Sequence, residues 1–205
     1  MFLASPDDIR KVLGFDDMPD INAALADCLN SATSQLESLL HTSFARAEHI
    51  DLFFVEEPTF PSGATQFRLS NGLVTGEPEV LVGFDTDFME PLEGMVFDRD
   101  RGLATDLKTR YNRQYVQITY TAGFDPLPID PADPSDPPPP PVSYDLTQVP
   151  KWLQDAARLR AMHLLGSNPV MTEANILLSA KTLTQQFGTL VNARLRYHPA
   201  ALLPM

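Results

Sequence analysis

Residues 115–123 read Tyr-Val-Gln-Ile-Thr-Tyr-Thr-Ala-Gly, and this stretch decides the fold of the chain. Its side chains alternate, with Val116, Ile118 and Tyr120 on one side of an extended backbone and the threonines on the other. The alternation predicts a strand with one buried face and one face that is wet or touches another subunit. We expect the strand to end at Gly123 and the chain to leave the sheet there.

Upstream of this strand, residues 46–123 as a whole have the texture of a β-region. Turn sequences such as Asn71-Gly72 and Asp98-Arg-Asp-Arg-Gly102 separate short stretches rich in β-branched and aromatic residues. We therefore expect an antiparallel β-insertion. Its predicted strands are Ile50–Val55, Gln66–Leu69, Val80–Phe84, Met95–Phe97 and Tyr115–Thr121.

Two helices are predicted before the β-region, over residues 5–13 and 20–42. Ser5 would cap the first through its hydroxyl and Gly14 would end it, while Asp20 would cap the second. The second helix carries an apolar stripe at three- and four-residue steps, which faces a core or a partner subunit. The stripe consists of Ile21, Ala24, Leu25, Cys28, Leu29, Ala32, Leu36, Leu39 and Leu40.

A third helix is predicted over residues 148–166, opened by Val149-Pro150 and ended by Gly166. The predicted fold class is therefore α+β: a bundle of the two N-terminal helices and helix 148–166, with an inserted antiparallel β-region and an extended C-terminal tail. In that tail Thr172 can cap a helix through about Leu183, but the Thr/Gln-rich stretch Thr182–Thr189 favours extended backbone.

Nine of the 19 prolines lie between Phe124 and Val142. Prolines donate no backbone hydrogen bond and favour extended polyproline geometry. Residues 125–147 are therefore predicted to form a surface loop that acts as a spacer.

The charge of the chain is unevenly divided. The formal net charge is −12, and residues 1–150 carry 25 acidic and 9 basic side chains, whereas residues 151–205 carry 2 acidic and 6 basic. Such acidity disfavours tight binding of nucleic acid, which depends on Lys and Arg, but it suits a wall past which DNA slides. The single cysteine, Cys28, fits a reducing compartment, and no apolar run approaches a membrane span, so we expect a soluble protein made in a cytoplasm.

No motif in the sequence points to a reaction or to a cofactor. The four histidines have no metal-ligand spacing and are interpreted as surface or capping residues. The pairs Asp85/Asp87 and Asp98/Asp100 can in principle bind a hard cation, but Asp98–Gly102 fails the calcium-loop pattern and is better explained as a charged hairpin turn. We therefore expect no enzyme, no cofactor and no metal site.

The elements and their order resemble a known family. The likeness rests on Ser5-Pro6-Asp7-Asp8, on Ala32-Thr-Ser-Gln-Leu-Glu-Ser-Leu-Leu40 before an Arg-bearing strand, on Val116-Gln-Ile-Thr-Tyr-Thr-Ala-Gly-Phe124, and on Val149-Pro-Lys-Trp-Leu-Gln-Asp-Ala-Ala157. In these features residues 5–166 resemble the head–tail connector, or adaptor, proteins of tailed bacteriophages. The spacer Pro126–Pro141 and the extended C-terminus depart from the family's compact form.

The resemblance implies a structural protein of the virion neck, assembled in the host cytoplasm. It implies a homo-oligomeric ring, commonly of twelve copies, that binds beneath the portal protein and extends the DNA channel without specific DNA binding. The ring would link the capsid to a stopper or tail-completion protein. Alternatives are a tail-terminator or stopper-type ring protein of the same neck and, from a different class, a small carboxylate-dependent hydrolase.

On this hypothesis residues 1–166 form the adaptor domain and residues 167–205 a C-terminal docking segment. Two contact surfaces are predicted, one toward the portal near the C-terminus and one toward the tail within the β-region. The portal-docking candidates are Arg194, Arg196, Tyr197, Leu202 and Leu203, and the tail-side candidates are Asp85, Asp87, Phe88, Asp98 and Asp100.

Overall fold

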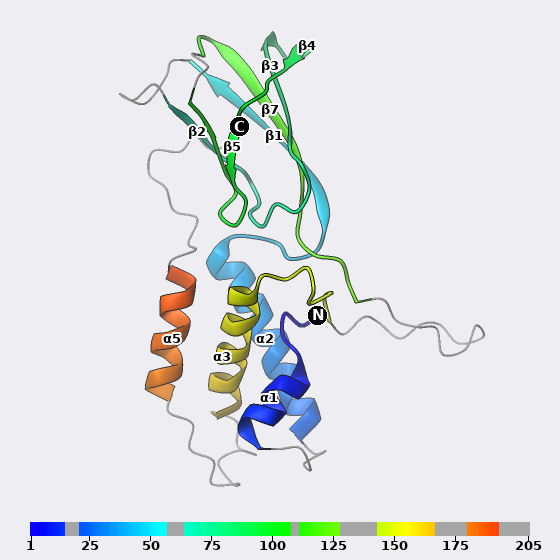
Figure 1. Ribbon diagram of the computed structural model, residues 1–205, viewed down its shortest axis with the longest axis vertical. Coiled ribbons are helices and arrows are strands. Elements are labelled where there is room, and N and C mark those ends of the chain that lie inside the picture. Colours follow the sequence, from blue (N-terminus) through cyan, green and yellow to red (C-terminus); the bar gives the residue numbers. More distant parts are fainter. Residues whose placement is uncertain (15–20, 57–63, 108–110, 128–142, 167–179, 193–205) are drawn as a thin grey trace, which may run out of the picture. The chain divides into compact units, whose positions relative to one another are not determined.

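The computed structural model describes residues 1–14, 21–56, 64–107, 111–127, 143–166 and 180–192. They form an α+β fold divided into two compact units (Figure 1), so the predicted fold class is confirmed. We call Met1–Leu39 with Phe124–Ala193 the helical unit and Leu40–Gly123 the β unit. Among the described residues, no helix is both long enough and apolar enough to cross a membrane.

Helix α1 (Pro6–Leu13) ends at Gly14, whose φ of 71° is the left-handed conformation that glycine adopts readily. Ser5 stands at the N-cap position, but its hydroxyl makes no capping hydrogen bond, so the predicted hydroxyl cap is wrong. Proline and two acidic residues in the first turn suit the helix start instead. Arg10 fixes the helix by donating to Asp7 at 2.9 Å and to Asn22 at the start of the next helix.

Helix α2 (Asn22–Leu40) buries the predicted stripe, and Leu25, Leu29 and Leu36 are fully inaccessible to solvent. Leu39 departs from the prediction because it lies on the edge of the stripe and is 44% exposed. His41 follows the last turn with φ of 49°, which is a helix-capping conformation. The predicted cap Asp20 lies outside the described residues.

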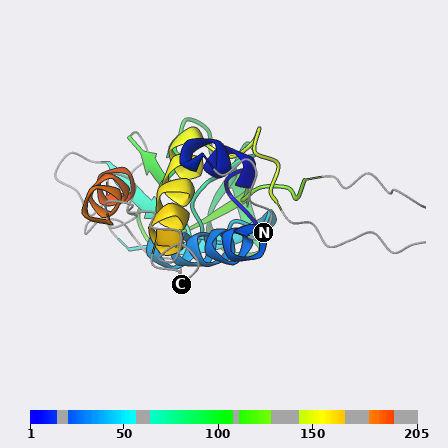
Figure 2. The same ribbon diagram turned by 90° about the horizontal axis from the view of Figure 1, so that it is seen from below.

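Helix α3 (Lys151–Gly166) begins where the Val-Pro pair predicted it, because the Pro150 carbonyl accepts its first backbone hydrogen bonds. Gln154 adds a clamp: its side-chain amide donates to the carbonyls of Leu146 at 2.8 Å and Val149 at 2.9 Å. The helix runs beside α2 (Figures 1 and 2), where Arg160 donates to Gln35 at 2.5 Å. Three small residues of α3 are buried, namely Ala156, Ala157 and Ala161.

Helix α5 (Ala180–Asn192) contradicts the extended backbone predicted for Thr182–Thr189. Threonine content favours strand, but Phe187, Leu190 and Val191 recur at helical spacing and Val191 is buried. The helix packs on α3, where the Arg160 guanidinium lies 5.8 Å from the centre of the Phe187 ring. Tertiary burial therefore overrides the local β propensity.

The base of the proline-rich loop is held firmly in the helical unit. Backbone hydrogen bonds join Leu127 to Ser143 at 2.8 Å, and Tyr144 to Phe2 at 3.1 Å. The three segments thus form a short ribbon with Phe2 and Tyr144 buried. Residues 128–142, which contain most of the predicted spacer, lie outside the described residues.

The β unit contains two antiparallel sheets. The first has strand order β1-β7-β3-β4 and the second β2-β6-β5. The strands are β1 (Ala47–Val55), β2 (Thr65–Arg68), β3 (Glu79–Asp85), β4 (Phe88–Pro91), β5 (Val96–Asp98), β6 (Leu103–Asp106) and β7 (Gln114–Ala122). Strands β4 and β6 were not predicted, because each has only four residues and neither shows an alternating apolar pattern.

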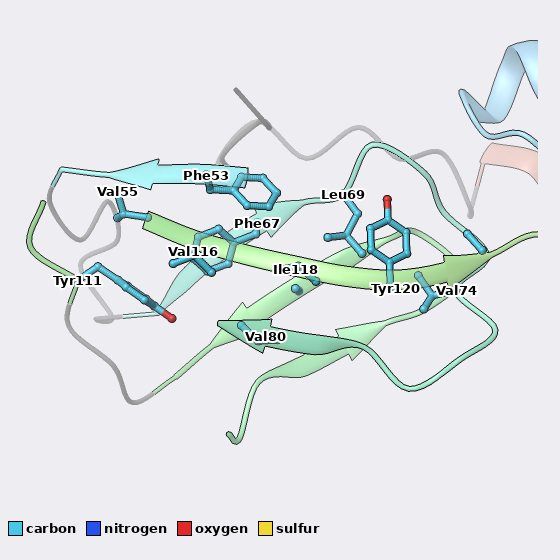
Figure 3. Packing of buried hydrophobic residues seen from close by; sticks show 12 residues of the cluster. Phe53, Val55, Phe67, Leu69, Val74, Val80, Tyr111, Val116, Ile118 and Tyr120 are labelled. Carbon is cyan, nitrogen blue, oxygen red and sulfur yellow. The ribbon is translucent and has the colours of Figure 1, made fainter. Parts of the chain in front are cut away.

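The central strand β7 confirms the prediction made from its sequence. Val116, Ile118 and Tyr120 are buried, whereas the side chains between them are partly exposed. The buried face packs into an apolar core between the sheets (Figure 3). Phe67 is fully buried there, edge-on to the rings of Phe53 and Tyr111 at centroid distances of 5.1 and 5.6 Å.

Candidate interaction surface

Two aromatic side chains are exposed at the β3–β4 hairpin of the β unit. Phe84 is 75% exposed and Phe88 is 81% exposed. Both line one hollow of about 210 Å³, together with Val82, Gly83, Glu90 and Gln114. Large apolar side chains that gather at a surface typically mark a binding site, so this hairpin is the candidate interaction surface.

A β-bulge produces the exposure of Phe84. Strict alternation from Val80 and Val82 would point Phe84 into the core, but the β3–β4 register shifts between Val82 and Asp85. Gly83 makes the bulge possible, since a Cβ there would lie 2.3 Å from the Phe88 carbonyl oxygen. Phe84 was not among the predicted site residues. The signal was available, because an isolated glycine within a strand indicates a bulge.

Carboxylates surround the aromatic pair. Asp85 accepts a hydrogen bond from the Asp87 backbone at 3.3 Å and so shapes the turn. Asp85, Asp87 and Glu90 are all exposed, and the described part of the chain shows no ion pair to any of them. The predicted tail-side residues Asp85, Asp87 and Phe88 therefore lie together on one acidic, aromatic hairpin.

The other two tail-side candidates, Asp98 and Asp100, lie at the opposite end of the β unit. In the β3–β4 hairpin, Gly83 pairs with Tyr115 at the start of β7 (Figure 1). Arg99 lies between the two other aspartates, and its carbonyl accepts a hydrogen bond from the Val74 backbone at 3.0 Å. Val74 pairs with Ala122, at the end of β7. The structure therefore does not bring the two aspartate pairs together.

The Asp98–Gly102 segment is the turn of the β5–β6 hairpin, as predicted. Asp98 accepts from the Arg101 backbone at 3.3 Å and forms an ion pair with the Arg101 guanidinium at 3.7 Å. Gly102 takes a φ of 61° to close the turn. Asp98 is thus paired with a neighbouring cation, whereas among the described residues no ion pair forms to the carboxylates of the β3–β4 hairpin.

The portal-docking candidates Arg194, Arg196, Tyr197, Leu202 and Leu203 lie outside the described residues, as does His198. Within the described ranges, no group of three or more His, Cys, Asp or Glu side chains is placed to hold a metal ion. Cys28 is buried as expected. Its burial, and secondarily the Asp27 carboxylate, raises the pKa of the thiol.

A buried polar cluster in the β unit contains a carboxylate and a phenol, which are groups that acid–base catalysis can use. Asp51 accepts from the Ser70 backbone at 2.6 Å and from the Tyr120 hydroxyl at 3.0 Å. The Tyr120 hydroxyl in turn accepts from the Asn71 backbone at 2.9 Å. Asn71 accepts from the Ser43 backbone at 2.9 Å. The cluster thus fastens the chain entering the β unit to the turn at residues 70–72, which is a structural role.

Because of this cluster, we expect the free energy of unfolding to depend on pH. The pKa of Tyr120 is raised to about 12, chiefly because the hydroxyl is buried. In an unfolded chain a tyrosine ionises near pH 10. Between these values the unfolded chain releases a proton that the folded chain keeps, so stability falls as the pH rises. We expect the decrease to be on the order of 2 kcal/mol between pH 10 and 12, measured by urea unfolding.

The matched variants are Tyr120→Phe and Tyr115→Phe. Tyr120→Phe should be less stable than the unmodified protein below pH 10 by about 1–3 kcal/mol, because it leaves buried partners without a hydrogen bond. That deficit should shrink as the pH rises to 12. Tyr115→Phe, on the partly exposed face of β7, should keep the full pH dependence. If the stability difference between Tyr120→Phe and the unmodified protein stays constant from pH 10 to 12, the raised pKa does not belong to Tyr120.

No family model matches the chain, and no curated protein matches it. Among solved structures the chain is similar to a chain of the "Neck of empty GTA particle computed with C6 symmetry". The two share 16% sequence identity over 96% of this chain and 91% of that chain, with a TM-score of 0.44. A likeness at this level carries no argument about function, which rests on the residues of this chain.

Proposed function

We propose that this chain is a structural adaptor of a phage neck, which forms a ring under the portal and links the capsid to the tail. The observation that carries the proposal is the β3–β4 hairpin, which presents two exposed aromatic side chains among carboxylates that form no ion pair with any residue the structure describes. Exposed rings at a fixed hairpin suit a protein that docks. The ring, the copy number of twelve, the portal contact and the DNA channel belong to this proposal.

The motifs behind the resemblance support the proposal because each has a mechanical role. Gly123, which ends the β7 motif, has φ of 88° and leaves no room for a side chain beside Ala45. Gln154, within the Val-Pro helix motif, clamps the turn that precedes α3. Both motifs therefore fix how the chain passes between elements. A protein whose function is to hold other proteins in place needs such fixed junctions.

In this proposal each of the two contact surfaces binds a different partner protein. The hairpin with Asp85, Asp87 and Phe88 faces the tail-completion protein. Arg194, Arg196, Tyr197, Leu202 and Leu203 dock on the portal. The acidic surface of residues 1–150 lets DNA pass, because it offers few cations to bind phosphates.

Deleting Arg194–Met205 should remove the protein from capsids without unfolding it. The deletion takes away the two arginines and the apolar side chains of the proposed portal contact and leaves every described helix and strand in place. Incorporation into particles is measured by quantitative mass spectrometry, and folding by circular dichroism. The deleted protein should show the same thermal transition as the full chain and less than about one tenth of its incorporation, as expected when a main contact of an interface is lost.

The matched control is Ile50→Ser, which removes a side chain that is 63% exposed elsewhere on the chain. It should join capsids at the normal level. Full occupancy of the deletion variant would disprove the portal assignment. If imaging of intact particles finds the full chain anywhere except at the neck, the proposed function itself is wrong.

A further inference from the structure

The hollow between Phe84 and Phe88 has the composition of a site for a cationic side chain. Its lining residues include two phenylalanines, one glutamate and one glutamine, namely Phe84, Phe88, Glu90 and Gln114. Aromatic faces attract cations through their quadrupole, and a neighbouring carboxylate adds an ion pair. We propose that this hollow receives one arginine side chain of the tail-side partner. The assignment of that partner rests on the proposed function, whereas the chemistry of the site does not.

The size of the hollow favours a single side chain. Pockets for drug-sized ligands typically measure about 300–1,000 Å³, and this hollow measures about 210 Å³. A guanidinium is planar, so it stacks on a phenyl ring and still presents its N–H groups to a carboxylate in its plane. The compact, strongly hydrated ammonium of lysine cannot do both, so the site favours arginine.

The charge around the hollow favours a cation from outside the β unit. Glu90, Asp85 and Asp87 are exposed, and no ion pair within the described ranges neutralises them. Some other carboxylates form ion pairs with cations on the same element. Asp155, for example, pairs with Lys151 at 3.4 Å and with Arg158 at 3.1 Å. Arg113 is the cation next to Gln114 in sequence, and no ion pair joins it to Glu90 among the described side chains. The hairpin therefore keeps an excess negative charge for its partner.

The backbone fixes where the two phenylalanines leave the sheet. Gly83 is buried, and the Phe88 carbonyl occupies the space that a side chain at Gly83 would fill. The bulge thus sets where β4 returns beside β3, and with it the spacing of Phe84 and Phe88.

The test uses the full chain and three short probes, acetyl-Gly-Arg-Gly-amide and its citrulline and lysine counterparts. Citrulline keeps the shape of arginine and lacks the charge. Backbone amide resonances of Gly83 and Gln114 are followed by NMR during titration. The arginine probe should shift them saturably, with a midpoint on the order of 10 mM for one side chain. The citrulline probe should leave them in place.

Two variants separate the two parts of the site. Phe84→Leu/Phe88→Leu keeps apolar side chains but removes the ring faces, and Glu90→Gln removes the charge. Each should weaken the arginine-dependent shift at least about fivefold, since each removes one of the two attractions. Ile50→Ser is the matched control and should bind as the unmodified chain does. All four positions are exposed, so each variant should keep its thermal transition.

Three outcomes would overturn the inference: equal shifts with the citrulline probe, arginine shifts that survive both variants, or a lysine probe that binds as tightly as arginine. None of these outcomes bears on whether the chain forms part of a neck. Conversely, a chain found outside the neck would overturn the proposed function and leave the arginine titration unchanged. The two failures are therefore distinguishable.

Discussion

Replacing Gly123 by alanine should lower the free energy of unfolding by about 3 kcal/mol or more, the largest effect expected from so small a change. Gly123 has φ of 88°, a conformation that costs other residues on the order of 1–3 kcal/mol. A Cβ there would also lie 2.5 Å from the Ala45 carbonyl oxygen and 2.8 Å from that of Phe44. The overlap is with backbone, so no side chain can rotate to relieve it.

The chain contains a matched control for this prediction. Gly94 has nearly the same φ, 90°, and its position leaves open space where a Cβ would be. Gly94→Ala therefore measures the conformational strain alone and should cost about 1 kcal/mol. Both variants are compared by urea unfolding followed by circular dichroism. If they lose equal stability, the close approach to Ala45 and Phe44 is not what holds β7 in place.

Phe67→Ala should destabilise the chain by about 3–5 kcal/mol, which is a large part of the roughly 5–15 kcal/mol that holds a typical domain together. Phe67 is fully buried and touches the rings of Phe53 and Tyr111 edge-on. The truncation removes its buried apolar surface and leaves a cavity that the two neighbouring rings cannot fill. The loss should appear as a lower urea midpoint of the β unit.

Phe88→Ala makes the same chemical change where the ring is 81% exposed. It should change the stability by less than about 0.5 kcal/mol, because the side chain has little contact to lose. The difference between the two variants tests whether Phe67 supports the fold and Phe88 serves binding. A large loss for Phe88→Ala would show that the hairpin is part of the core and would remove the basis of the docking surface.

The regular elements could be predicted where local chemistry and burial agree. Gly14 ends α1, Pro150 starts α3, and the alternation around Ile118 places the right face of β7 in the core. In each case one residue type fixes the local backbone or the periodicity fixes the buried face. The helix α5 and the strands β4 and β6 could not be predicted, because packing against other elements stabilises them.

The candidate site was predictable in part. Asp85, Asp87 and Phe88 do lie on one surface, as a single hairpin turn requires. Phe84 was missed because the bulge at Gly83 reverses the face that alternation assigns to it. Asp98 and Asp100 were grouped with the hairpin on sequence proximity alone. The strand order decides how far Asp98 and Asp100 lie from the β3–β4 hairpin. No local sequence pattern encodes that strand order.

By itself the sequence determined the fold class, the end of α1, the start of α3 and the two faces of the central strand, because these follow from backbone chemistry over a few residues. Only the tertiary structure decided which phenylalanines are buried, as Phe67 is, and which are exposed, as Phe84 and Phe88 are. Burial of a phenylalanine side chain would stabilise the fold at any of these three positions. Which one is buried depends on strands that meet from distant parts of the chain, β7 between β1 and β3.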